Sequence, residues 1–212
     1  RSFRVKPVSR VKGEITLLGD KSIAHRSIII SAISKGPTTI ENFPTNKDCL
    51  YTIKAFKRLG IKIIQGSKNI ITIYGKGHYG LTEPKGAIFV GDSGTTFRLL
   101  LGVLAGQNFK VKLAAGKSLA QRPMLRVNSP LRMMGAKINS IPPKAGGNSK
   151  REEYPPITIE GGNLRPITYK MPVASAQVKS AIILAGLCTK GLTQVIEPIR
   201  TRDHTERMLR LF

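Results

Sequence analysis

The chain repeats one pattern three times, and this repetition limits the possible folds more than any other feature of its 212 residues. Each copy has a short β-type run, a turn of small or polar residues, and an apolar helix that ends at glycine, a frequent helix stop. The copies read ITLLGDKSIAHRSIIISAISKG at 15–36, AIFVGDSGTTFRLLLGVLAG at 87–106 and ITYKMPVASAQVKSAIILAGLCTKG at 167–191. Such a repeat of strands and helices predicts an α/β (α+β) fold.

The likeness continues after each apolar helix. A second β-type run follows at 37–43, 109–116 and 192–198. An amphipathic helix with basic residues near its end comes next, at 46–60, 122–135 and 201–212. After the first two of these helices we expect β-hairpins, one with a Gly-Ser-Lys-Asn turn and one with a long polar loop. The repeated unit is therefore βαβαββ.

We place these units at about 14–80, 85–163 and 165–212, within one domain that covers residues 14–212. The first two units are complete, whereas the third reaches Phe212 without its hairpin. A helix whose apolar face expects that hairpin would be left exposed. We therefore expect an incomplete chain that lacks at least two strands.

The turns before the apolar helices carry residues suited to an anion. A helix N-terminus has unpaired N–H groups and a partial positive charge. In the first copy Lys21 and Ser22 lie in the first turn, and Arg26 follows Ser22 by four residues on the same face. In the second copy Gly94 lets a ligand approach the backbone closely, and Arg98 follows four residues later.

The third copy offers Ser175, Gln177 and Lys179 at its helix start. If the repeat brings the three starts together, they form one region for phosphate or carboxylate groups. The alternative is three well-capped helices whose charges are ordinary solvated ones.

Further arginines lie at the starts of the amphipathic helices. Arg122 directly precedes Pro123, a residue favoured in the first turn, so we expect Arg122 to open the second helix of its unit. The matching place in the third unit holds Thr201, Arg202 and Asp203. Arginine suits a bidentate grip on phosphate or carboxylate, although a plain surface arginine fits either place equally well.

No acid stands out as a general base. The candidates are Asp48, Asp92, Asp203 and Glu206. Asp48 and Asp203 fit equally well as acids that favour a helix dipole, and Glu206 fits the surface of a helix. The sequence therefore indicates where anions bind and leaves the proton-transfer group open.

The formal net charge of +23 indicates phosphate or polyanion partners, nucleic acid included. However, aromatic residues make up only 6%, Trp is absent, and the cations are spread along the chain apart from a cluster at 144–153. A nucleic-acid surface usually concentrates its charge or interleaves aromatics. A nucleic-acid-binding module built of βαβαββ repeats is therefore the alternative function and not the preferred one.

The sequence carries no signal of a membrane protein, a secreted protein or a metalloprotein. No apolar run is long enough to span a membrane, and the N-terminal residues lack a signal-peptide core. Cys49 and Cys188 fit buried thiols of a reducing compartment, so we expect a cytoplasmic protein. The histidines are scattered, and we predict no metal site.

Five blocks of the chain, taken together, resemble the 5-enolpyruvylshikimate-3-phosphate (EPSP) synthase family. They read GDKSIAHR, GDSGTTFRLL, SLAQRPM, ASAQVKSAIILAGL and TRDHTERML, and they occur in the family's order from about Gly13 to Phe212. The enolpyruvyl transferase of peptidoglycan synthesis shares the fold, but it has a Lys-Asn pair where this chain has Lys21 and Ser22. Its reactive cysteine is also missing from the loop GKSLAQRPM.

The resemblance implies transfer of the enolpyruvyl group of phosphoenolpyruvate to the 5-hydroxyl of shikimate 3-phosphate, with release of phosphate and without a cofactor. It implies two domains of three βαβαββ units each, of which this chain is the N-terminal one. Residues 1–13 then belong to, or link to, the missing C-terminal domain. The acids that transfer protons also lie in that domain, so we expect this chain alone to be an inactive substrate-binding half.

The resemblance also assigns roles to residues of this chain. Lys21 is the implied catalytic residue and contacts both substrates. Shikimate 3-phosphate is bound by Lys21, Ser22, Arg26, Ser175, Ala176, Gln177, Thr201 and Arg202. Phosphoenolpyruvate is bound by Lys21, Gly94, Arg122 and Gln177. The chain departs from the family at Asp92, where asparagine is usual, and at Ala24, where serine is common. A carboxylate at Asp92 opposes an anionic ligand unless a cation such as Arg98 neutralises it.

Overall fold

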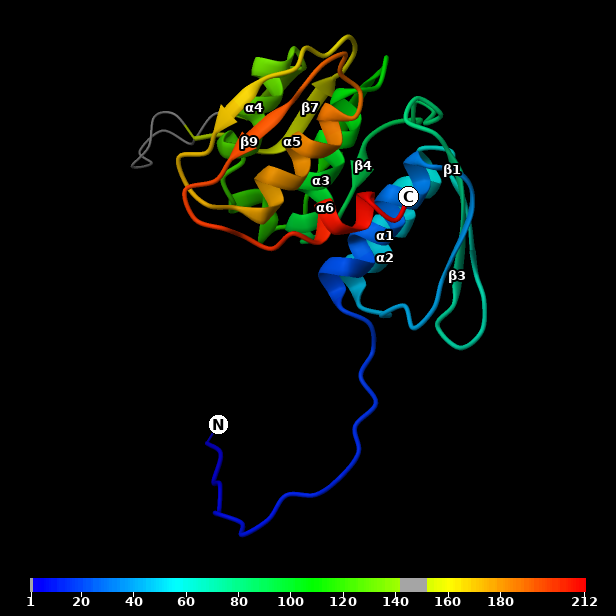
Figure 1. The fold of residues 1–212 in the computed structure, drawn as a ribbon, viewed down its shortest axis with the longest axis vertical. Helices are drawn as coiled ribbons and strands as arrows, with labels where there is room; N and C mark the ends of the chain where they lie inside the picture. The colour runs from blue at the N-terminus through cyan, green and yellow to red at the C-terminus, as the bar shows by residue number, and fades with distance from the viewer. Residues whose placement is uncertain (1, 142–151) are drawn as a thin grey trace.

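The computed structural model describes residues 2–141 and 152–212. Three helices with mainly apolar sequences, α1 (Lys21–Ile33), α3 (Gly94–Ala105) and α5 (Ala176–Gly186), pack together at the centre of the molecule. The sheets and the remaining helices surround them (Figure 1). The mixture of helices and strands confirms the α/β fold class predicted from the repeat.

The first repeat forms an antiparallel sheet of order β1-β3-β2 beside α1. Its elements after α1 are β1 (Lys35–Ile40), α2 (Lys47–Arg58), β2 (Lys62–Gln65) and β3 (Ile71–Lys76). The hairpin β2–β3 is confirmed, and Lys68 and Asn69 turn it with positive φ angles of 55° and 58°. Alternation places Ile71 and Ile73 in the core.

The second repeat forms a mixed sheet of order β4-β5-β7-β6. Its strands are β4 (Ile88–Phe89), β5 (Lys110–Ala114), β6 (Lys137–Ile141) and β7 (Tyr154–Glu160), and its second α-helix is α4 (Leu125–Met134). The predicted antiparallel hairpin β6–β7 is confirmed. Its long loop lies outside the described residues, as does most of the basic cluster at 144–153.

The third repeat has two parallel strands, β8 (Thr168–Lys170) and β9 (Gln194–Ile196), on either side of α5 in the sequence. It continues into α6 (His204–Leu209), which contacts both α1 and α5. This helix is shorter than the expected 201–212, so Thr201 and Arg202 lie in the loop before it.

The strand expected at 15–18 is absent, and this prediction is wrong. In the second and third repeats, Val90 N–H and Met171 N–H donate to Ala114 and Ile196 at the end of a parallel ladder. In the first repeat the corresponding bond, from Gly19 N–H to Asn42, is present, but the described residues form no ladder before it. Ile15 and Leu17 are exposed, and the segment extends away from the body (Figure 1). A β-type run forms a strand only where a backbone partner is within reach.

The central helices pack closely because of where their small residues lie. Every residue of α1 from Ala24 to Ile33 is buried, so this helix is surrounded by protein on all sides. Between α3 and α5, Gly102 lies so close to Ala181 that a Cβ would overlap its backbone. None of the helices in the described parts of the chain is long and apolar enough to cross a membrane.

Candidate functional site

The three apolar helices begin where the sequence predicts, each with a polar N-cap. Asp20 accepts a hydrogen bond from Ile23 N–H at the start of α1. Ser93 caps α3 through Thr96 N–H, and Ser175 caps α5 through Val178 N–H. These caps satisfy some of the free N–H groups and leave others at each helix start for a ligand.

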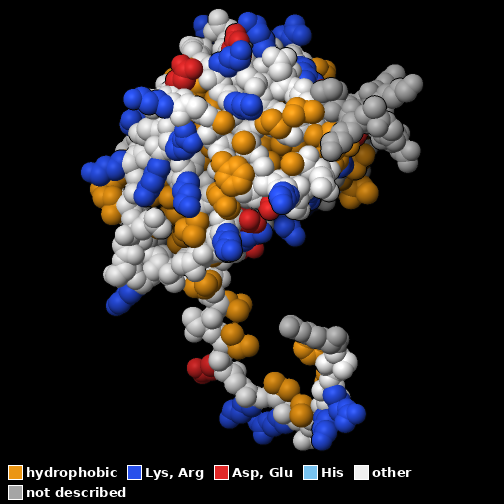
Figure 2. All heavy atoms as spheres, turned by 180° about the vertical axis from the view of Figure 1, so that it is seen from behind, with side chains coloured by type: hydrophobic (Ala, Val, Ile, Leu, Met, Phe, Trp, Pro, Cys, Tyr) orange, Lys and Arg blue, Asp and Glu red, His pale blue; other side chains and the backbone are white. Residues whose placement is uncertain are grey.

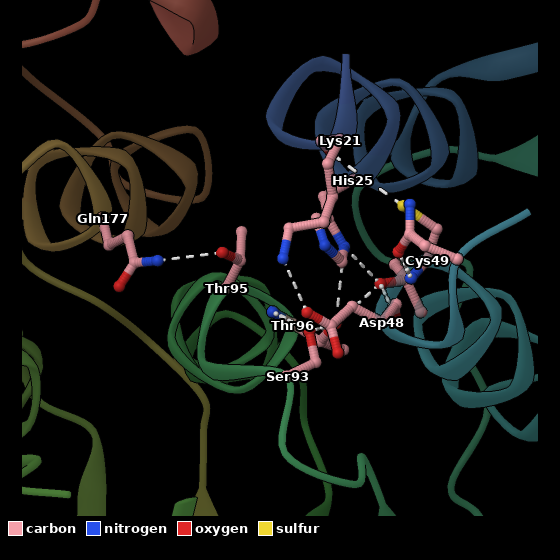
Figure 3. A network of polar contacts seen from close by, with 10 residues as sticks. Lys21, His25, Asp48, Cys49, Ser93, Thr95, Thr96 and Gln177 are labelled. Carbon is pink, nitrogen blue, oxygen red and sulfur yellow. Dashed lines mark hydrogen bonds and ion pairs between the residues drawn. The ribbon is translucent and has the colours of Figure 1, made fainter. Parts of the chain in front are cut away.

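Side chains connect the three helix starts to one another (Figure 3). Gln177 Nε2 at the start of α5 donates to Thr95 Oγ1 in α3 at 2.8 Å. His25 of α1 lies 2.7 Å from Thr52 Oγ1 of α2, and Thr52 lies 2.7 Å from Thr96 Oγ1 of α3. The predicted convergence of the three helix starts is therefore present.

His25 is fully buried in this connection. Its Nδ1 faces Thr52, whereas its Nε2 has no partner among the described residues. Burial disfavours the charged imidazolium and lowers the pKa of His25 to about 4, although Asp48 opposes the shift. The imidazole is therefore neutral near pH 7.

Lys21 lies at the start of α1, and its side chain is half exposed. Its Nζ donates to Asp48 Oδ2 of α2 at 2.8 Å, and the Lys21 side chain keeps 53% of its exposure. Figure 3 shows the two side chains pointing toward each other. Lys21 is therefore oriented by an acid and still open to a ligand.

Arg26 is buried, which the sequence analysis did not foresee. Its Nε donates to Thr205 Oγ1 at 2.7 Å and its Nη2 to Ser180 Oγ at 3.0 Å. Its Nη1 donates to the Ser22 carbonyl, one turn earlier in α1, at 2.9 Å. Burial lowers the pKa of Arg26, while Glu206 opposes the shift and the nearby Arg202 adds to it.

Two further arginines lie at the start of α3. A Cβ added to Gly94 would lie 2.9 Å from Arg98 Nη1 and 3.2 Å from Arg122 Nη1, so both guanidinium groups flank this glycine. Arg98 Nη1 also donates to Gln177 Oε1 at 3.0 Å. Burial, together with the charges of Arg122 and Arg126, lowers the pKa of Arg98 to about 10.

Arg122 does not open a helix, contrary to the prediction. It follows a short 3₁₀ helix, η1 (Leu119–Gln121), and α4 begins only at Leu125. Met124 N–H donates to the Glu153 carbonyl at 2.8 Å, which places this segment beside β7 before the helix begins. The exposed Arg122 side chain reaches Gly94 from a loop.

Asp92 has a structural partner rather than the expected cation. Its Oδ1 accepts a hydrogen bond from Leu119 N–H at 2.9 Å, at the start of η1. No hydrogen bond or ion pair joins its carboxylate to Arg98 within the described residues, so neutralisation by Arg98 is not supported. Asp92 instead holds the loop that carries Arg122.

Lys179 and Glu206 also lie differently from the expectation. Lys179 is buried, and its Nζ pairs with Glu197 at 2.8 Å and Glu206 at 2.7 Å, so it is not free for an anionic ligand. Burial opposes its charge, but the two carboxylates raise the pKa of Lys179. Thr201 Oγ1 donates to Glu197, the residue after β9, and Glu197 in turn pairs with Lys179 of α5.

Sequence reasoning missed Ser180 and Thr205, the two hydroxyls that contact Arg26. The one available signal for Ser180 was a hydroxyl that follows Lys179 in a mainly apolar helix. Both cysteines are free thiols, and burial raises the pKa of Cys49 to about 11. In the described ranges, no group of His, Cys, Asp and Glu side chains is arranged to hold a metal.

The face of the molecule seen in Figure 2 does not favour the nucleic-acid alternative. Lysine and arginine side chains are scattered over the face seen in Figure 2, with apolar patches between them. A nucleic-acid-binding surface usually concentrates such charges in a stripe or patch.

The model of the family described as EPSP synthase (3-phosphoshikimate 1-carboxyvinyltransferase) matches residues 5–212. The 3-phosphoshikimate 1-carboxyvinyltransferase of Brevibacillus brevis is 51% identical over 210 residues, which cover 99% of this chain and 47% of that protein. The protein of the same name from Geobacillus thermodenitrificans is 53% identical over 205 residues, covering 97% and 45%.

Solved structures agree with these relatives. An EPSP synthase structure from Acinetobacter baumannii superposes with a TM-score of 0.87 at 46% identity and covers 94% of this chain and 43% of that one. The chain thus spans about half the length of the relatives it matches. The nucleic-acid alternative finds no support in these comparisons. The match over nearly the whole sequence, together with the shared fold, shows that the chain belongs to the EPSP synthase family.

Proposed function

We propose that this chain is the substrate-binding half of an enzyme that moves the enolpyruvyl group of phosphoenolpyruvate to the 5-hydroxyl of shikimate 3-phosphate. The oxygen of the 5-hydroxyl forms a bond to C2 of the enolpyruvyl group and loses its proton, the bond between C2 and the phosphate oxygen breaks, and the proton is balanced by the inorganic phosphate that leaves. The observation that carries the proposal is the convergence of three helix N-termini with Lys21, Arg26 and the Arg98–Arg122 pair. The family relationship supports the choice of substrates.

The residues divide into two groups around this convergence. We propose that shikimate 3-phosphate contacts α1, the start of α5 and the loop before α6, through Lys21, Ser22, Arg26, Ser175, Ala176, Gln177, Thr201 and Arg202. Phosphoenolpyruvate contacts the start of α3, through Lys21, Gly94, Arg122 and Gln177. Both groups contain Lys21 and Gln177, which suit a place between the two substrates.

Two anionic substrates repel each other in one site, and this repulsion defines the task of the cations. Lys21 is the proposed catalytic residue because its ammonium group, oriented by Asp48 at 2.8 Å, can lie between them and offset charge on both. Arg122 suits the phosphate of phosphoenolpyruvate because a guanidinium group binds phosphate with two parallel hydrogen bonds. Positioning and electrostatics then supply much of the rate.

We further propose that turnover requires a second, C-terminal half, to which residues 1–13 belong or link. The described residues 2–13 extend from the body and expose Phe3, Val5, Val8 and Val11, which suits a segment covered by another part of the protein. The chain's span of about half of its relatives agrees with this proposal. Two free thiols suit a cytoplasmic location.

The test joins this chain to the half of the Brevibacillus brevis relative that it does not match, and measures phosphate release from the two substrates. We expect release by the joined protein and none by the chain alone. In the joined protein, Lys21→Met abolishes release, whereas Lys137→Met, at an exposed ion pair away from the helix starts, leaves it unchanged. Release by the pure chain alone would refute the half-enzyme proposal, and loss of release with Lys137→Met would refute the assignment to Lys21.

A further inference from the structure

The guanidinium group of Arg26 is hydrogen-bonded to a buried chain of hydroxyl groups that no motif of the sequence identified. Arg26, Ser180 and Thr205 are exposed by 3%, 1% and 1%. They come from α1, α5 and α6, and Arg26 and Thr205 lie 179 residues apart in the sequence. A buried arginine with hydrogen-bond partners on two other helices has one fixed orientation.

The available protons fix the direction of each hydrogen bond between Arg26, Thr205 and Ser180. Ser180 has one hydroxyl proton and donates it to the Ala176 carbonyl at 2.6 Å. Thr205 lies 2.7 Å from Ser180 and must therefore donate to it, which leaves the Thr205 oxygen as acceptor for Arg26 Nε–H. The donors run from Arg26 through Thr205 and Ser180 to the first turn of α5.

In the described part of the chain, some N–H donors of Arg26 remain free to bind a ligand. Among the described residues, three of its N–H groups have partners: Nε–H in Thr205, one on Nη2 in Ser180, and one on Nη1 in the Ser22 carbonyl. A guanidinium group has five N–H donors. One donor on Nη1 and one on Nη2 are therefore left, held in fixed directions by the hydroxyl chain.

The helix that carries Thr205 is itself tied down. Lys179 of α5 pairs with Glu206 of α6 at 2.7 Å and with Glu197 before the loop at 2.8 Å. The Lys179 side chain is 5% exposed, so these pairs are shielded from solvent. Thr205 is thereby fixed against α5, as a hydroxyl that orients another group needs to be.

We propose that Thr205 is a positioning residue of the shikimate 3-phosphate site: it fixes the guanidinium group of Arg26 through the chain Arg26–Thr205–Ser180–Ala176. The inference rests on the proposed function and extends it to a residue that touches no substrate. It couples Arg26 to the first turn of α5, where Ser175, Ala176 and Gln177 lie. A change at Thr205 therefore affects the affinity for shikimate 3-phosphate through Arg26.

The test compares Thr205→Val, which keeps the shape and removes the acceptor, with Thr205→Ser, which keeps the hydroxyl. Isothermal titration of the full chain with shikimate 3-phosphate gives the affinities, and ¹⁵N NMR follows the exchange of Arg26 Nε–H with water. We expect Thr205→Val to weaken binding about tenfold and to speed that exchange, because a charged hydrogen bond is lost. Thr205→Ser restores both readouts.

Thr189→Val is the matched control, because Thr189 Oγ1 donates to a helix carbonyl at the far end of α5 and touches no site residue. It leaves affinity and Arg26 exchange unchanged. Equal affinity of wild type and Thr205→Val, or unchanged Nε–H exchange, would overturn the positioning role. If wild type itself binds no shikimate 3-phosphate, the proposed function of the chain fails, and the role of Thr205 in substrate binding fails with it.

Discussion

The two arginine groups of the site differ in how they are held. The inner group, which we define as Arg26 and Lys179, has partners for both cations: Arg26 has two hydroxyls and a carbonyl, and Lys179 has two carboxylates. Around Gly94, the outer group of Arg98 and Arg122 has no ion pair with a carboxylate in the described residues. The inner group is buried, whereas Arg122 is exposed.

This difference indicates two kinds of binding site. The inner group keeps its geometry without a ligand because three N–H groups of Arg26 and the ammonium group of Lys179 already have fixed partners. Burial lowers the pKa of Arg98, and the charges of Arg122 and Arg126 lower it further, so the guanidinium groups of the outer group disfavour one another's charge. An anion relieves this repulsion. We therefore expect the inner group to be preformed for shikimate 3-phosphate and the outer group to become ordered when an anion binds.

The largest expected effect concerns the ion pairs of the inner group. Lys179→Met leaves two partly buried carboxylates without a cation, and such a loss costs about 3–5 kcal/mol of unfolding free energy. Lys137→Met, which breaks the exposed pair with Glu160, produces no measurable change. Urea denaturation at pH 7 measures both. Similar stability of the two variants would contradict a tightly held inner group.

The second effect concerns His25, which connects α1 with Thr52 of α2 and Thr96 of α3. Its pKa of about 4 in the folded chain lies below the usual 6.5, so its contribution is complete above pH 6.5 and is lost as the pH falls toward 4. The loss amounts to about 3 kcal/mol. His25→Asn cannot titrate and flattens this part of the stability curve in denaturation at a series of pH values. If the His25→Asn variant loses stability between pH 6.5 and pH 4 as the wild type does, a group other than His25 causes that loss.

The third prediction separates the two groups by ligand. Arg26→Met weakens binding of shikimate 3-phosphate about 100-fold, because it removes the two remaining donors and the hydroxyl chain's donor. Arg122→Met leaves that affinity unchanged in the isolated chain but raises the KM for phosphoenolpyruvate about 100-fold in the joined protein. Titration calorimetry and steady-state kinetics measure these effects. If both variants lose both ligands equally, the division into two groups is wrong.

The smallest effect concerns Gly94. A methyl group there would lie 2.9 Å from Arg98 Nη1 and 3.2 Å from Arg122 Nη1, so Gly94→Ala displaces the tips of both side chains. We expect about a tenfold rise in the KM for phosphoenolpyruvate in the joined protein and little change in stability, because flexible tips can move. Gly13→Ala, with no atoms near the added methyl group, is the control. An unchanged KM with Gly94→Ala would separate the outer group from this substrate.

The elements that sequence predicts well are those set by local signals. The helix starts at Lys21, Gly94 and Ala176 follow polar caps, and the β2–β3 hairpin follows its turn residues. The strand at 15–18 has the local signal but no ladder partner in the described chain, so periodicity alone was misleading. Arg122 was misplaced because the contact between Met124 and Glu153 sets the start of α4 from a distance.

The chemistry of the site depends more on distant contacts. The roles of Lys179 and Thr205 follow from Glu206 and Arg26, which the repeat does not place beside them. The cations themselves were visible in the sequence, but their partners were not. Composition and motif therefore indicated an anion site, and only the packing of α6 against α1 and α5 shows which of its cations is fixed.

The claim that the inner group is preformed is tested most directly by ¹⁵N NMR of the isolated chain during titration with shikimate 3-phosphate, with inorganic phosphate as the control. We predict localised amide shifts at Lys21, Ser22, Arg26, Ser175 and Gln177 that inorganic phosphate does not reproduce. A well-dispersed spectrum of the folded chain in which none of these amides moves would contradict a preformed site for this substrate.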